Sequence, residues 1–185
     1  MRKIALILTL LCMLSSLSSC GMESVIPENS ATFAAFEDNA ALYEECVAIL
    51  SAQETDCMIS KTNFYAAEGS EDFPGLYRQN MEDNSFSACD EPAILTLFEN
   101  TDVKIVDYLQ KGNLKICVFD MCIPGKNFDY GIYYTSEDRP VYFGDTELTL
   151  AESGNGFTYE KSASYGSKFI YYTEKITDHY YYYEI

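Results

Sequence analysis

The chain has 185 residues, of which 48% are hydrophobic and 15% aromatic. This length and composition predict one folded domain whose apolar core needs neither disulfides nor metals for stability. The formal net charge of −17 argues against nucleic acid and anionic lipid head groups as partners, because both would be repelled.

The N-terminus begins with the basic residues Arg2 and Lys3, and an apolar run follows over residues 4–14. A helix that spans a bilayer needs about 20 apolar residues, so this run is too short for a permanent membrane helix. It is typical of the apolar part of a secretory signal, and the serines around residues 15–19 supply the small side chains that a signal peptidase requires.

The signal ends in Leu17-Ser18-Ser19-Cys20, which resembles the lipobox of bacterial lipoproteins. The resemblance implies a signal peptide over residues 1–19, cleavage before Cys20, and lipid attached to the Cys20 thiol. Two or three acyl chains hold a protein firmly to a membrane. We therefore expect residues 20–30 to form a lipidated tether, with the protein on the extracytoplasmic side of the cell membrane or outer membrane. Loss of Arg2 and Lys3 with the signal would change the net charge from −17 to −19.

Apolar residues at spacings of three and four predict a helix over residues 31–51, with Asn29 or Ser30 as its cap. The stripe consists of Phe33, Phe36, Ala40, Tyr43, Val47 and Leu50. A second helix is predicted from Pro92, which suits a first helical turn, to about Asn100, with Asp90 as its cap.

Short strands are predicted at residues 57–61 and 75–78, and the sequence becomes rich in β-forming residues after residue 103. Runs that flank turn sequences predict four hairpins. They pair 103–109 with 114–122, 130–135 with 141–143, 147–151 with 157–161, and 169–176 with 180–185. The predicted fold is a single α+β domain over residues 31–185, with one or two N-terminal helices packed on a meandering antiparallel β-sheet.

Five cysteines would remain beyond the lipidation site, and an odd number permits at most two disulfides. They are Cys46, Cys57, Cys89, Cys117 and Cys122. Buried free thiols are the alternative, because cysteine packs well as a small apolar residue. Cys117 and Cys122 fall five apart on one predicted strand, so they should face opposite sides and not pair with each other.

No pattern in the sequence predicts a catalytic residue, a cofactor or a metal site. The single histidine, His179, falls in the predicted last turn, where a solvated side chain is expected. No nucleophile motif and no calcium-loop pattern occur. Two carboxylates could perform hydrolysis, but 29 acidic residues make such a pair unspecific.

The 16 tyrosines are the most unusual feature of the composition. Because side chains alternate along a strand, half of each tyrosine run should face away from the helices. Tyr133, Tyr171, Tyr181 and Tyr183 are the candidates for such an outward binding face, since tyrosine is enriched at interfaces. Core packing would also explain these runs.

Residues 131–134 and 180–184 resemble segments of uncharacterised exported lipoproteins, and that resemblance implies no activity. The favoured function is a non-enzymatic binding module of the cell envelope with an acidic, tyrosine-rich sheet surface, of which an inhibitor or immunity protein is one version. Its partner would be a basic exported protein or a glycan. The alternatives are an envelope hydrolase that uses paired carboxylates and a structural envelope component. Converging acids of raised pKa in a pocket would favour the hydrolase.

Overall fold

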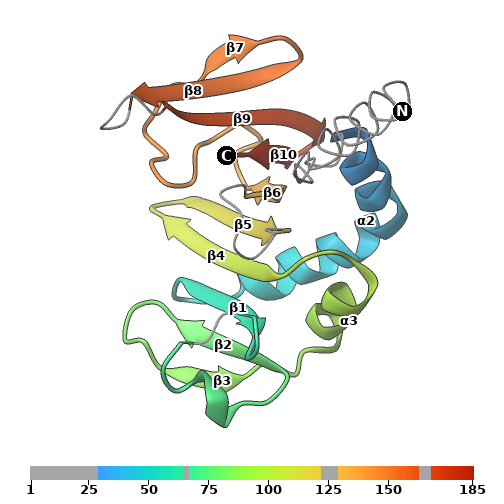
Figure 1. The fold of residues 1–185 in the computed structure, drawn as a ribbon, viewed down its shortest axis with the longest axis vertical. Coiled ribbons are helices and arrows are strands. Elements are labelled where there is room, and N and C mark those ends of the chain that lie inside the picture. Colours follow the sequence, from blue (N-terminus) through green and yellow to red (C-terminus); the bar gives the residue numbers. More distant parts are fainter. Residues whose placement is uncertain (1–28, 65–66, 122–128, 163–167) are drawn as a thin grey trace, which may run out of the picture.

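A computed structural model describes residues 29–64, 67–121, 129–162 and 168–185 of the chain. Within these residues two helices and a ten-stranded antiparallel sheet form an α+β fold (Figure 1). The helices are α2 (Asn29–Ser51) and α3 (Pro92–Asn100). The strands are β1 (Cys57–Lys61), β2 (Leu76–Asn80), β3 (Phe86–Ala88), β4 (Ile105–Lys111), β5 (Leu114–Asp120), β6 (Tyr130–Thr135), β7 (Ala151–Ser153), β8 (Gly156–Ser162), β9 (Lys168–Thr177) and β10 (Tyr180–Glu184).

The strand order is β3-β2-β1-β4-β5-β6-β10-β9-β8-β7, and every pair is antiparallel. The predicted α+β class is confirmed. The predicted meander is interrupted twice, because β1 pairs with β4 and β6 pairs with β10. The pairing of β6 with β10 joins the first six strands to the last four in one sheet (Figure 1).

Helix α2 follows the predicted stripe, and Phe36, Tyr43, Val47 and Leu50 are buried on its sheet-facing side. The rings of Phe36 and Tyr180 lie 4.9 Å apart, and Tyr43 meets Phe119 of β5 edge-on at the same distance. These contacts place the first hydrophobic core between the helices and the sheet.

Helix α3 has Pro92 in its first turn, as predicted, but its cap differs from the prediction. The residue at the cap is Glu91 and not Asp90, and its side chain makes no capping hydrogen bond. Instead the Glu91 carboxylate forms a salt bridge with Arg78 of β2, with 2.6 Å between the nearest atoms. Three strands precede α3, so of the two described helices only α2 is N-terminal to the sheet.

Two strand predictions are wrong. Residues 141–143 form no strand, because Val141 directs its backbone groups to tyrosine hydroxyls and not to a neighbouring strand. Strand β7 begins only at Ala151, so the segment expected over residues 147–151 lies almost wholly outside the sheet. The predicted strand at residues 57–61 is confirmed, and β3 was not predicted.

The four described cysteines carry free, buried thiols: Cys46, Cys57, Cys89 and Cys117. Burial raises the pKa of Cys57 to about 11 and that of Cys46 to about 12, which keeps both thiols protonated. Of the two alternatives for these residues, the structure has buried thiols. Cys122 lies outside the described residues, and the prediction that it does not pair with Cys117 is therefore not tested.

The signal segment, Cys20 and the tether up to residue 28 also lie outside the described residues. Among the residues that are described, neither helix combines the length and apolarity needed to cross a membrane.

Candidate functional site

The four tyrosines predicted to form a binding face are all buried. Tyr133 and Tyr171 are 0% exposed, Tyr183 is 1% exposed and Tyr181 2%. They do share one face of the sheet, as alternation predicted, and that face lies opposite the helices. Residues 136–150, which follow β6, cover this face with Val141, Tyr142 and Phe143 and complete a second hydrophobic core. The prediction of an exposed tyrosine face is therefore wrong.

Hydroxyl groups inside this second core hold the covering segment in place. Tyr171 Oη donates to the carbonyl of Val141 at 2.7 Å, and the Val141 amide donates to Tyr133 Oη at 3.1 Å. Thr173 Oγ1 donates to the carbonyl of Tyr182, so the 3.0 Å contact between Tyr133 Oη and Thr173 Oγ1 has Tyr133 as its donor. Because the hydroxyls of Tyr133 and Tyr171 are hydrogen-bonded, these tyrosines can be fully buried without leaving their own hydroxyls unpaired.

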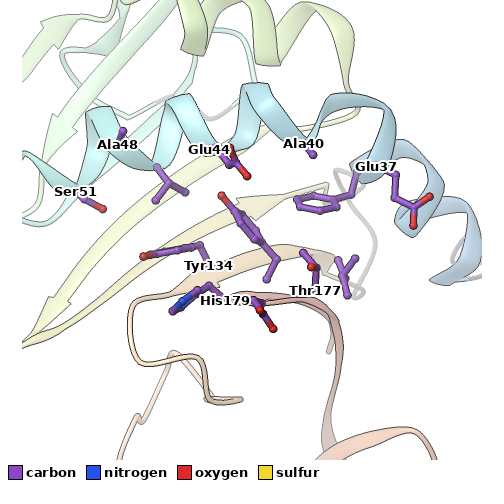
Figure 2. A pocket seen from close by; sticks show the side chains of 13 residues that line it. Glu37, Ala40, Glu44, Ala48, Ser51, Tyr134, Thr177 and His179 are labelled. Atoms are coloured by element: carbon purple, nitrogen blue, oxygen red, sulfur yellow. The ribbon is translucent and has the colours of Figure 1, made fainter.

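The largest cavity described is an open groove between α2 and the turn that joins β9 to β10, with a volume of about 820 Å³. Figure 2 shows α2 side chains along one wall and Tyr134, Thr177 and His179 on the other. The lining residues are Phe36, Glu37, Ala40, Glu44, Val47, Ala48, Ser51, Tyr134, Ile176, Thr177, Asp178, His179 and Tyr180.

Small side chains on α2 leave the space that forms this groove. Ala40, Ala48 and Ser51 line it together with Glu37 and Glu44, at helical spacings of three and four residues. This second stripe shares Ala40 with the core-facing stripe and otherwise borders it, and from Glu37 to Ser51 it extends about 21 Å along the helix axis. The groove is thus elongated along α2 and open to solvent rather than a closed chamber.

The opposite wall is fixed by hydrogen bonds around His179. This residue has a left-handed backbone, with φ of 68°, and its amide donates to Asp138 at 2.7 Å. The ring Nδ1 lies 2.9 Å from the carbonyl of Thr135 and must carry the hydrogen, because a carbonyl only accepts. Tyr134 stacks beside the ring with 5.7 Å between centroids. His179 is therefore half-buried and held, unlike the solvated side chain predicted.

The carboxylate of Asp138 holds the same turn through hydrogen bonds. The His179 amide and the Lys175 ammonium both donate to its carboxylate, and these bonds lower the pKa of Asp138 to about 2. Its carboxylate also accepts a bond from Tyr181 Oη at 3.2 Å. The turn is consequently anchored to the sheet on which Tyr134 lies.

The groove is acidic. Its lining includes Glu37, Glu44 and Asp178 but neither lysine nor arginine. Lys175, at the margin, pairs with Asp178 at 3.0 Å, whereas Glu37 and Glu44 make no salt bridge within the described residues. Burial, followed by the nearby charge of Glu44, raises the pKa of Tyr180.

Asp107 of β4 is the described acid whose pKa is raised, and Asp120 of β5 is the acid that contributes to this shift. Burial and then the charge of Asp120 raise the pKa of Asp107 to about 7. Neither residue lines the groove or the three smaller cavities described, so the pair lies apart from these four cavities. The described part of the chain also has no cluster of three or more His, Cys, Asp or Glu side chains placed to hold a metal ion.

In comparisons with known proteins, no family model, no curated protein and no solved structure matches this chain significantly. Sequence reasoning missed the groove because it followed only the core-facing stripe of α2. The available signal was the second stripe of small and acidic residues, from Glu37 to Ser51.

Proposed function

We propose that this chain is a non-enzymatic binding protein of the cell envelope, which holds a positively charged partner protein in the groove between α2 and the β9–β10 turn. The observation that carries the proposal is the open groove of about 820 Å³, in which the carboxylates of Glu37 and Glu44 form no salt bridge with any residue that the structure describes. An inhibitor or immunity protein would be one form of such a module.

The charge of the chain favours a basic protein over a glycan as partner. Processing before Cys20 would change the net charge from −17 to −19, because Arg2 and Lys3 would be lost. A field of this sign accelerates the approach of a basic protein and orients it, whereas a neutral sugar gains nothing from it. Nucleic acid is repelled by the same field.

The lipid on Cys20 would hold this groove near a membrane. Eight residues lie between Cys20 and Asn29, where α2 begins, and the nine residue-to-residue steps span at most about 30 Å. The binding protein would therefore work close to the outer face of the cell membrane or outer membrane.

The anchor is tested by replacing Cys20. Cells that express the wild-type chain are expected to incorporate a labelled fatty-acid analogue into it, and Cys20→Ser is expected to abolish the label, because serine lacks the thiol that receives the lipid. Gel fluorescence after labelling measures the difference, with Cys57→Ser as the control that retains its label. Equal labelling of the Cys20→Ser variant would reject the anchor.

The groove is tested by filling it. Ala48 is exposed and lines the groove, so Ala48→Leu should occupy space without disturbing either core, and leucine is a good helix former. The immobilised wild-type chain is expected to retain one or more culture-supernatant proteins. Immobilised Ala48→Leu should retain at least tenfold less of these proteins, as measured by quantitative mass spectrometry.

The matched control is Ala41→Leu, because Ala41 is also exposed on α2 but does not line the groove. This variant should retain the same proteins as wild type, and circular dichroism should show all three chains folded. Retention that is unaffected by Ala48→Leu, or that is lost equally in both variants, would contradict a binding site in the groove.

A further inference from the structure

We infer that the groove recognises an extended segment of its partner that contains arginine, with the guanidinium group between Glu44 and the stacked rings of Tyr134 and His179. This inference rests on the proposed binding function and names the chemistry of the ligand. Three features of the groove carry it: a fixed pair of rings, a carboxylate on the facing wall, and an apolar floor.

The ring pair offers a flat surface that is already ordered. Tyr134 and His179 are both half-buried, and their planes are 30° apart. Bonds to Asp138 and Thr135 hold His179, while Tyr134 also contacts the ring of Tyr180 at 5.4 Å. A planar cation can stack on such rings, and little side-chain entropy should be lost because these contacts already hold the rings.

Glu44 supplies the matching charge from the helix. Figure 2 shows Glu44 on α2 and Tyr134 and His179 on the other side of the groove. Glu44 has no salt-bridge partner among the described residues, so an incoming cation displaces none of the protein's own. Glu37 lies two helical turns away, about 10 Å along the axis, within reach of a second basic side chain.

The floor suits the aliphatic part of such a segment. Phe36 and Val47 lie at the base of the groove, and Ala40, Ala48 and Ile176 add apolar surface beside them. The methylene stem of arginine can cover this surface while its charged end reaches the carboxylate. An extended chain rises about 3.4 Å per residue, so about six residues fill the 21 Å length of the groove.

Arginine is favoured over lysine because the two cations differ in shape. The guanidinium group is planar, stacks on aromatic rings and can donate two parallel bonds to one carboxylate. The lysine ammonium is a point charge that gains little from a stacked ring pair. The groove provides a carboxylate and a ring pair together. Arginine can bind both at once, whereas lysine gains mainly from the carboxylate.

The test uses three fluorescein-labelled hexapeptides that alternate leucine with arginine, lysine or citrulline, the last being a neutral isostere of arginine. Fluorescence anisotropy measures their binding to the full chain in a zwitterionic detergent. The arginine peptide is expected to bind at least about fivefold more tightly than the lysine peptide and at least tenfold more tightly than the citrulline peptide. Equal binding of all three would overturn the inference.

Variants of adjacent glutamates separate the groove from the general acidity of the chain. Glu44→Gln is expected to weaken binding of the arginine peptide about tenfold, because the substitution removes the negative charge of the carboxylate. Glu45 is exposed on the same helix and does not line the groove, so Glu45→Gln should change the dissociation constant less than twofold. Equal effects of the two substitutions would mean attraction by net charge alone and would reject the inference.

The ring pair is tested by Tyr134→Leu, which should remove the preference for arginine over lysine while both peptides still bind. A preference that survives this substitution would exclude stacking. Failure of the ligand chemistry can be told from failure of the binding function: if Ala48→Leu abolishes partner capture but binding does not depend on arginine, the groove remains the site and this inference falls.

Discussion

Gly131→Ala is expected to lower the free energy of unfolding by about 3 kcal/mol or more, because a methyl group at this position has no space. Gly131 lies inside β6, between Asp120 of β5 and Tyr183 of β10. A Cβ atom there would collide with the backbone carbonyl of Phe119 and would lie 3.1 Å from the Tyr183 ring and 3.2 Å from the Asp120 Cα. The Tyr183 ring could rotate away from the new methyl group. The backbone of Phe119 and Asp120 cannot move away without disturbing the pairing of β5 with β6.

Urea denaturation followed by circular dichroism measures this effect. Gly112→Ala is the control, because a Cβ at Gly112 would meet nothing within 4 Å. The only cost expected there comes from the positive φ of 63°. Its expected loss is about 1 to 2 kcal/mol, the usual penalty of a left-handed backbone for a residue with a side chain. If the two variants lose the same free energy of unfolding, β5 and β6 are not packed as closely as described.

Asp107→Asn is expected to stabilise the protein by about 2 kcal/mol at pH 8 and to have little effect at pH 4. The pKa of Asp107 is raised to about 7 in the folded protein, chiefly by burial and then by Asp120, whereas an unfolded chain has an ordinary aspartate. Between about pH 4 and pH 7 the folded state therefore binds a proton that the unfolded chain releases. Stability falls as the pH rises through this range, and the full penalty remains above the folded pKa.

The full difference of about three pKa units corresponds to about 4 kcal/mol, and the side chain keeps some contact with solvent, which reduces that figure. Melting temperatures of wild type and Asp107→Asn, measured at pH 4, 6 and 8, should diverge as the pH rises. Asp38→Asn, on the exposed side of α2, is the control and should follow wild type throughout. Parallel curves for Asp107→Asn and wild type would contradict the raised pKa.

Features set by neighbouring residues could be predicted from the sequence. The stripe from Phe36 to Leu50 identified α2 because burial on a helix repeats every three or four residues. The hairpin of β4 with β5 followed from two β-rich runs around Gly112. In each case the information lies within about 20 residues of sequence.

Features that depend on distant contacts could not be predicted. Nothing local to Tyr130–Thr135 indicates that β10 is its partner. Alternation placed Tyr133 and Tyr181 on one face, but only the fold shows that residues 136–150 cover them. The groove likewise forms where Glu44 meets a turn that contains His179, more than 130 residues later.

The central place of β10 has a consequence for how the protein is made. The chain is made and would be exported from its N-terminus, so β6 emerges about 45 residues before β10. Until β10 pairs with it, the edge of β6 has unpaired amide and carbonyl groups, which can form hydrogen bonds with strands of other copies of the chain. A holding chaperone that shields Tyr130–Thr135 during this interval would protect the growing polypeptide from aggregation.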